Sequence, residues 1–182
     1  MNLVFLYGPP AAGKYTVGSI ISKSLGYGFL HNHVTVDFVE GIFPFGTSRY
    51  RKLNKDLRLQ IIKAAVRCGA KGLVMTYLFA LDSKSDWREF EHFRRAATSH
   101  SGKMYVVELR CERNELFKRI TDKSRRRFHK ISSRKKLRKV ITSHVFQSSD
   151  RFRAKPTTLV FDTTHASPAT TAKRILQSLK LS

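Results

Sequence analysis

The chain has 182 residues, of which 41% are hydrophobic and 11% aromatic, enough apolar material for one folded core. This composition excludes a wholly disordered chain. Lysine and arginine number 35 against 13 acidic residues, a formal net charge of +22. A field of this sign attracts phosphates, nucleic acid or an anionic membrane surface.

The compartment is suggested by what the sequence lacks. No apolar run approaches the roughly 20 residues that a membrane-spanning helix needs. The opening MNLVFLYG has no basic segment before its apolar run, so it predicts a first strand and not a signal peptide. Cys68 and Cys111 have neither disulfide nor zinc spacing, and we predict two buried thiols. The expectation is a cytoplasmic protein without a membrane span, either a monomer or a homodimer.

Strands and helical segments alternate along the chain. Apolar runs of strand length predict strands, and apolar positions three or four residues apart predict helices. In chain order the predicted elements are strand 3–7, helix 17–25, strand 27–31, helix 51–68, strand 72–80, helix 85–98, strand 103–109, a helix from about Glu112, strand 157–162, and a final helix ending near Leu179. The helix over 51–68 is expected to bury Leu53, Leu57, Ile61, Ala64 and Cys68. This alternation predicts a parallel sheet with helices on both faces.

A phosphate-binding motif follows the first predicted strand. GPPAAGK, residues 8–14, matches G-x-x-x-x-G-K between a strand and a helix, the context that the motif requires. Pro9 and Pro10 have no backbone N–H, so the amides after them must bind the phosphates at the helix start. Lys14 is expected to neutralise charge between the β- and γ-phosphates. The predicted nucleotide-binding residues of the loop are Gly8, Ala11, Ala12, Gly13, Lys14, Tyr15 and Thr16.

Tyr15 stands where this loop usually carries the short hydroxyl that binds Mg²⁺. A phenol is too long to reach the same ion from the same backbone position, so that protein ligand is lost. Mg²⁺ keeps its waters readily and can be held mainly by substrate phosphates, so both ATP and Mg²⁺ remain expected. Thr16 is expected to hydrogen-bond the α-phosphate and to reach the metal mostly through water.

With threonine two residues after Lys14, the loop resembles that of the P-loop kinases of small molecules and nucleotides, the adenylate-kinase, shikimate-kinase and chloramphenicol-phosphotransferase group. The similarity extends to LGYGFLHNH, VVELRCERNELFKRI and LVFDTTHASPATTAKRIL, and so covers nearly the whole chain. It implies a P-loop NTPase fold, a three-layer α/β/α sandwich with five parallel strands in the order 2-3-1-4-5. It also implies ATP-dependent transfer of the γ-phosphoryl group to a small-molecule or nucleotide acceptor.

A basic segment over 118–139 holds twelve Lys and Arg residues against Asp122 alone, a net charge of +11. The resemblance implies that this segment contributes to a basic helical lid, inserted at about 123–150 in a single kinase domain over 1–182. Arg126, flanked by Arg125 and Arg127, would then approach the phosphates when the lid closes. The planar donors of arginine suit this role because they pair with phosphate oxygens bidentately.

The resemblance also assigns the residues that contact the base. Arg119 would stack on the adenine. The turn over 162–167, which contains Thr164, would border the same ring.

The acceptor side departs from the family's pattern. Shikimate-kinase-like members carry Asp-x-Asp after the second strand, whereas this chain has His31-Asn32-His33. A helix that starts near His33 places Asp37 one turn along on the same face. The carboxylate would then orient or charge a histidine that hydrogen-bonds the acceptor hydroxyl. His33 and Asp37 are the predicted catalytic pair, but His31 and Asp82 remain alternative bases.

Other acceptor-side groups have simpler interpretations. Arg49 and Arg51 could hold an anionic acceptor, or they could be solvated charges at a helix start. A His-x-His metal site at 31–33 lacks a third ligand at a suitable spacing.

The basic charge supports a second function. It exceeds what one nucleotide needs, so a polynucleotide 5′-hydroxyl kinase or a basic nucleic-acid-binding ATPase is the alternative to a small-molecule kinase. Binding of nucleic acid with a steep salt dependence would favour that alternative.

Overall fold

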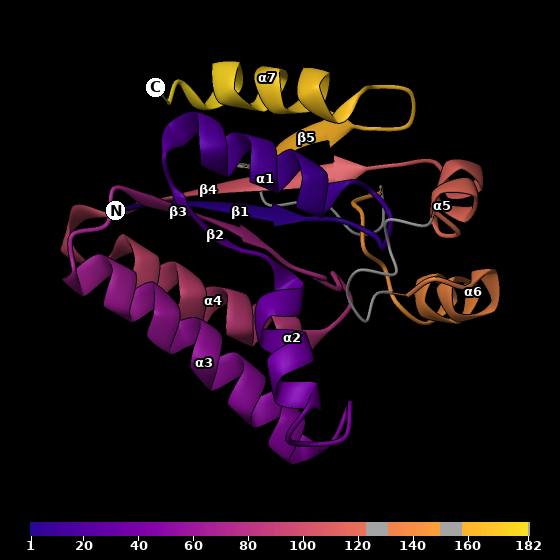
Figure 1. The fold of residues 1–182 in the computed structure, drawn as a ribbon, viewed down its shortest axis with the longest axis horizontal. Helices are drawn as coiled ribbons and strands as arrows, with labels where there is room; N and C mark the ends of the chain where they lie inside the picture. The colour runs from indigo at the N-terminus through magenta and orange to yellow at the C-terminus, as the bar shows by residue number, and fades with distance from the viewer. Residues whose placement is uncertain (123–130, 150–157, 182) are drawn as a thin grey trace.

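The fold is seen in a computed structural model that describes residues 1–122, 131–149 and 158–181. Its five parallel strands lie in the order β2-β3-β1-β4-β5 (Figure 1). The strands are β1 (Asn2–Tyr7), β2 (Gly28–Leu30), β3 (Gly72–Thr76), β4 (Lys103–Arg110) and β5 (Leu159–Asp162). The predicted α/β sandwich and its strand order are therefore confirmed.

Helices cover both faces of the sheet and extend beyond its carboxyl edge. Figure 1 shows α1 (Lys14–Leu25) and α7 (Pro168–Leu179) on one face, and α3 (Ser48–Arg67) and α4 (Lys84–Thr98) on the other. The remaining helical elements are α2 (Asn32–Glu40), the short 3-10 helix η1 (Ser99–Ser101), α5 (Arg113–Arg119) and α6 (Arg134–Ser143). None of the described helices combines the length and the apolar composition that crossing a bilayer requires.

The sheet separates two hydrophobic cores, and the central strand β1 contributes side chains to both. Val4 and Leu6 point into the core under α1 and α7, whereas Leu3, Phe5 and Tyr7 point into the core over α3 and α4. All five side chains are at most 2% exposed. A strand buried on both faces has a continuous apolar sequence, and this is why LVFLY predicts its position correctly.

The predicted buried face of α3 is wrong. The residues that α3 buries are Tyr50, Asn54, Arg58 and Ile62, whereas Leu53, Leu57, Ile61 and Ala64 are half-buried. Polar side chains occupy the inner face because they find hydrogen-bond partners there, which hydrophobic periodicity does not reveal. Cys68, at the end of the expected face, is exposed. Of the two thiols predicted to be buried, only Cys111 is.

Candidate nucleotide and acceptor site

The loop between β1 and α1 passes very close to the neighbouring strand. Gly8 has a φ of 145°, and a Cβ at this position would lie 2.2 Å from the carbonyl oxygen of Leu109. Gly13, which precedes α1, has a φ of 88°, and Ala11 has a φ of 68°. A side chain is strained in this region of φ, so residue 8 must be glycine for both conformation and space.

The start of α1 has a positive electrostatic potential. No side chain caps the helix at Gly13. Lys14 Nζ donates hydrogen bonds to the carbonyl oxygens of Gly8 and Pro9, both at 2.7 Å, so its ammonium group lies over the loop. The helix dipole adds partial positive charge at the same point. This combination can bind a phosphate chain.

Tyr15 points toward the end of β2. Its ring centroid lies 4.9 Å from that of His31, edge to face, and 5.6 Å from that of Phe29. The phenol ring therefore packs between α1 and the end of β2. Thr16 is exposed on the first turn of α1.

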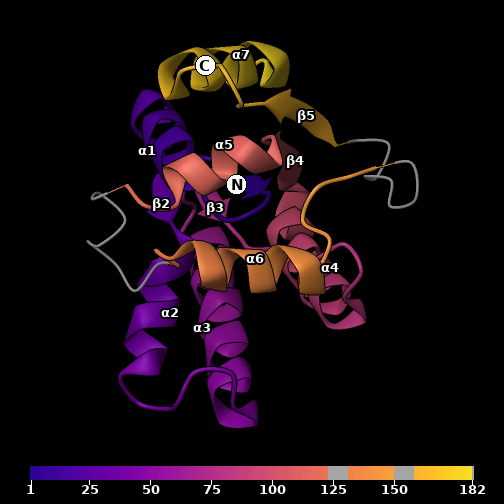
Figure 2. The same cartoon turned by 90° about the vertical axis from the view of Figure 1, so that its right-hand side faces the viewer.

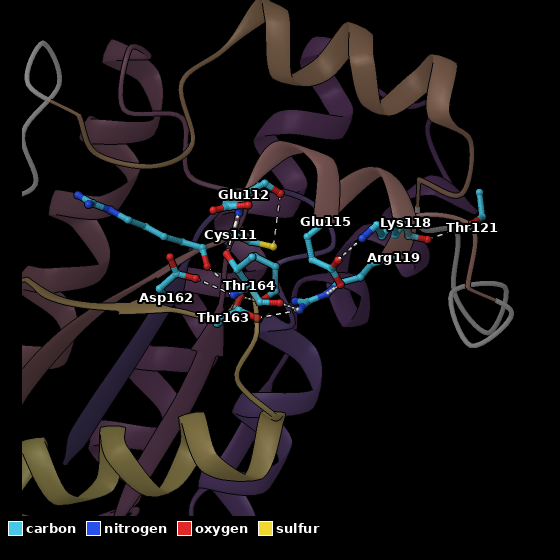
Figure 3. A network of polar contacts seen from close by, with 11 residues as sticks. Cys111, Glu112, Glu115, Lys118, Arg119, Thr121, Asp162, Thr163 and Thr164 are labelled. Atoms are coloured by element: carbon cyan, nitrogen blue, oxygen red, sulfur yellow. Dashed lines mark hydrogen bonds and ion pairs between the residues drawn. The ribbon is translucent and has the colours of Figure 1, made fainter.

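Arg119 and Thr164, the two residues predicted to bind the base, come together from α5 and the β5–α7 turn (Figure 3). Arg119 Nη2 donates to the carbonyl oxygens of Thr163 and Thr164, both at 2.7 Å, and Arg119 Nε donates to Glu115 Oε1 at 2.8 Å. Thr163 Oγ1 donates to the carbonyl oxygen of Ala12 at 3.2 Å. The network therefore adjoins the phosphate loop.

Two titratable groups frame this turn. Asp162 Oδ1 accepts a hydrogen bond from Thr164 N at 2.6 Å, and hydrogen bonds from Thr164 hold the pKa of the Asp162 carboxyl below its usual range. Burial raises the pKa of the Cys111 thiol. The raised pKa disfavours the thiolate, which is the nucleophilic form.

His33 and Asp37 form the predicted pair on α2. His33 Nδ1 lies 3.0 Å from Asp37 Oδ1, and the side chains are 19% and 26% exposed. In the tautomer that carries its proton on Nδ1, this nitrogen donates to Asp37 Oδ1 and Nε2 is the basic nitrogen. The helix start is fixed to β3 because Asn32 N donates to Thr76 Oγ1 at 3.0 Å.

Arg58 is a buried cation that the sequence analysis missed. It is 6% exposed, and it donates from Nε to Thr35 Oγ1 and from Nη2 to Asn32 Oδ1, each at 2.9 Å. Its guanidinium carbon lies 5.0 Å from the ring centroid of Tyr77. Arg58 thus connects α3 to the start of α2. The feature of the sequence that could have indicated its burial is the i, i+4 spacing from Asn54, which places these two polar residues on the same face of α3.

The other acceptor-side candidates lie in different surroundings. Asp82 Oδ1 accepts a hydrogen bond from Val145 N at 3.0 Å, and Asp82 Oδ2 lies 3.5 Å from His144 Nδ1. Asp82 therefore connects the β3–α4 loop to the segment after α6. Arg49 and Arg51 are exposed at the start of α3.

The predicted lid is described only in part. Residues 131–149 contain α6, whereas Arg126 and its neighbours Arg125 and Arg127 lie outside the described residues. Their approach to the phosphates stays a prediction.

A buried carboxylate beside the loop also escaped the sequence analysis. Glu108 is fully buried and accepts hydrogen bonds from Tyr7 Oη at 2.7 Å, Ser148 N at 2.8 Å and Arg110 Nε at 2.8 Å. It therefore connects the segment after α6 to β1 and β4. Burial, with the hydrogen bond to Glu108, raises the pKa of Tyr7. The feature of the sequence that could have revealed Glu108 is an acidic residue within the largely apolar run KMYVVELR.

A resident metal cluster is not evident in the described part of the chain. Among residues 1–122, 131–149 and 158–181, no group of three His, Cys, Asp or Glu side chains is placed to hold a metal ion. β3 ends at Thr76, whose hydroxyl accepts the hydrogen bond from Asn32.

Comparison with solved structures defines the class of fold. A sugar kinase from Janibacter sp. HTCC2649 matches with a TM-score of 0.66 and 13% identity, covering 100% of this chain and 95% of that chain. A gluconokinase from Sinorhizobium meliloti 1021 matches with a TM-score of 0.66 and 18% identity, covering 98% and 91%. Shikimate kinase from Acinetobacter baumannii, solved with shikimate, matches with a TM-score of 0.61 and 18% identity, covering 98% and 92%. At these identities the likeness shows a P-loop kinase fold.

Sequence comparison gives the family. Residues 4–138 match the AAA domain family, so this chain belongs to it. No curated protein matches the sequence.

Proposed function

We propose that this protein is a P-loop kinase that transfers the γ-phosphoryl group of ATP to a hydroxyl group of a small-molecule or nucleotide acceptor. The observation that carries the proposal is the loop from Gly8 to Gly13. It leads into an uncapped helix start, and the Lys14 ammonium lies over it. The kinase fold of the structural neighbours supports the same reaction class.

On the nucleotide side, the backbone amides from Ala11 through Thr16 would bind the phosphate chain, and Gly8 would let the chain pass close to β4. Lys14 would neutralise charge as the γ-phosphoryl group loosens. Arg119 would present its guanidinium plane to the adenine, since Thr163 and Thr164 already fix that plane by hydrogen bonds.

On the acceptor side, His33 would act as the base, with its Nδ1–H held by Asp37. The acceptor hydroxyl would give its proton to Nε2 while its oxygen bonds to the γ-phosphorus. The bond from that phosphorus to the β,γ-bridging oxygen would break, leaving ADP. Arg58 would position the pair by holding the start of α2.

Charge and water must also be controlled. Mg²⁺, when bound to the ATP phosphates and water, would neutralise the charge that develops in the transition state, with Thr16 contacting it through water. Arg126, on the predicted lid, would contact the same phosphates and help to exclude the water that would otherwise take the phosphoryl group.

The acceptor class follows from the pair on α2. A histidine base suits a hydroxyl acceptor, which must lose a proton as it attacks. Three structural neighbours are named as a sugar kinase, a gluconokinase and a shikimate kinase. We therefore expect a polyhydroxylated acceptor, and a panel of sugars, sugar acids and nucleosides is the first set to assay.

Exchange of Lys14 tests the nucleotide side. In Lys14→Ala, titration calorimetry should detect no ATP binding, and phosphoryl transfer should fall by about 1000-fold or more, because the charge over the loop is removed. Lys23→Ala, at the exposed last turn of the same helix, is the matched control and should bind ATP as the unaltered protein does. Normal ATP binding by Lys14→Ala, with the fold intact by circular dichroism, would refute the loop assignment.

A further inference from the structure

A hollow separates α5 from α6, beyond the carboxyl edge of the sheet. Figures 1 and 2 both show the two helices side by side. The hollow has a volume of about 520 Å³ and is lined by Arg113, Asn114, Phe117, Lys118, Arg134 and Arg138. We call this surface the α5–α6 groove. Four of its six lining residues are cationic and none is acidic, so its chemistry favours an anion.

The cations of the groove are poorly neutralised by the protein. Within the described ranges, no carboxylate lies at ion-pair distance from Arg113, Arg134 or Arg138, and Lys118 Nζ has only Glu115 Oε2 at 3.6 Å. All four cationic side chains are exposed. Mutually repelling cations raise the local potential, which a bound polyanion would relieve.

The floor of the groove holds its guanidinium groups in place. The guanidinium carbons of Arg113 and Arg138 lie 5.8 and 5.9 Å from the ring centroid of Phe117, one from each helix. Contact with an aromatic ring orients the planar group without using its donors. The N–H groups can therefore pair with phosphate oxygens, and the guanidinium planes can stack on bases.

The groove is separate from the proposed ATP site. On α5, Arg113 and Phe117 share one side of the helix, whereas Glu115 and Arg119 share another. Arg119 is engaged with Thr163 and Thr164 on that second side. A ligand in the α5–α6 groove thus leaves the base-binding network intact.

We propose that the α5–α6 groove binds the phosphate backbone of a single-stranded nucleic acid. The proposal does not rest on the kinase reaction. The hollow is of a size that suits a ligand of about one nucleotide. Three further exposed cations, Lys135, Lys136 and Lys139, lie on α6 around the helix from Arg134 and Arg138. A helix of ten residues is about 15 Å long, so its cations can contact more than one phosphate of the same strand.

The occupant is a strand and not a single phosphate because the charge is spread out. Seven cations on two helices far exceed the needs of one phosphate group. Single-stranded binding sites commonly combine a basic groove with planar groups that accept bases of any sequence. The groove has both, through its exposed cations and its ring-oriented arginines.

Fluorescence anisotropy with a labelled oligouridine tests the proposal. The double variant Arg113→Gln/Arg138→Gln should bind at least about tenfold more weakly, and the slope of log K against log salt should become shallower by about 0.7 for each phosphate that the variant no longer neutralises. Arg134→Gln/Lys135→Gln, at two exposed positions of α6 of which Arg134 lines the groove, is a second variant with the same expected direction. Circular dichroism should show that both variants remain folded.

The matched control removes the same charge elsewhere. Lys173→Gln/Arg174→Gln lies on exposed positions of α7, away from α6 in Figure 1, and should change affinity by less than about threefold. If the control variant loses as much affinity for oligouridine, the general positive charge of the protein binds RNA, and the proposal for the groove is overturned. Displacement of the oligonucleotide by saturating ADP would place it in the ATP site instead. Tighter binding of a duplex of equal length, or no binding of either at low salt, would also refute the proposal. Retained binding in the presence of ADP, with groove-selective loss in the variants, would support it.

Discussion

The phosphate loop and the start of α2 lie at the same edge of the sheet, but they are fixed in different ways. The loop is shaped by its own backbone, through the positive φ angles of Gly8 and Gly13 and the close approach to Leu109. The start of α2 is held by side chains from distant segments, chiefly Arg58 of α3 and Thr76 of β3. A backbone-determined site leaves a short motif in the sequence, whereas one assembled by distant side chains does not.

The largest expected effect is on stability, from a substitution that disrupts the phosphate loop. Gly8→Ala places a Cβ against a backbone carbonyl, which cannot move without distorting β4, so we expect a loss of about 4 kcal/mol in the free energy of unfolding. Urea denaturation measures this loss. Gly46→Ala is the control, because Gly46 also has a positive φ but open space around it. It should lose only about 1 kcal/mol. Equal losses would show that φ alone, and not the approach to Leu109, requires glycine at residue 8.

The next effect separates chemistry from nucleotide binding. His33→Ala should lower turnover with the acceptor by about 100-fold, equivalent to about 2.7 kcal/mol in the barrier, because the proposed base is lost. ATP affinity, measured by calorimetry, should change by less than about twofold. His92→Ala, on an exposed position of α4, should alter neither quantity. If His33→Ala lowers turnover and ATP affinity by the same factor, or lowers neither, His33 does not act on the acceptor.

A smaller effect tests the support of α2. Arg58→Ala removes the hydrogen bonds to Thr35 and Asn32, so the His33 pair should lose its alignment, and kcat/KM for the acceptor should fall about tenfold. ATP affinity should persist, and Arg58→Lys should restore only part of the activity because it lacks the planar fork. The exposed Arg51→Ala is the control. A loss in Arg51→Ala that matches the loss in Arg58→Ala would instead favour direct binding of an anionic acceptor at the start of α3.

The smallest effect concerns the strained residue of the loop. Ala11 has a φ of 68°, so Ala11→Gly relieves strain and should stabilise the protein by less than about 1 kcal/mol, after the added entropy of the unfolded chain is subtracted. Ala12→Gly is matched in chemistry but has no positive φ to relieve, and should destabilise by about 1 kcal/mol. Thermal unfolding distinguishes the two signs. Destabilisation by both variants would show that the Ala11 methyl group contributes more by packing than it costs in strain.

Local patterns predict the His33–Asp37 pair at the start of α2, but not the contacts that support it. Asp37 lies one turn after His33 because helical periodicity is a short-range rule, and the structure shows the two side chains at 3.0 Å. Arg58 reaches Asn32 across 26 positions of sequence. No rule of local spacing gives that contact, and the usual expectation for an arginine in a charged helix is a solvated one.

The sequence by itself determines the alternation of strands and helices, the burial of β1 and the phosphate loop, because each depends on neighbouring residues or on backbone conformation. Only the tertiary structure places Glu108 among Tyr7, Arg110 and Ser148, and Asp82 beside His144. It alone brings Arg113 of α5 and Arg138 of α6 to the ring of Phe117. The physical reason is that a buried or clustered charge needs partners from distant segments, and only the packed chain brings those partners together.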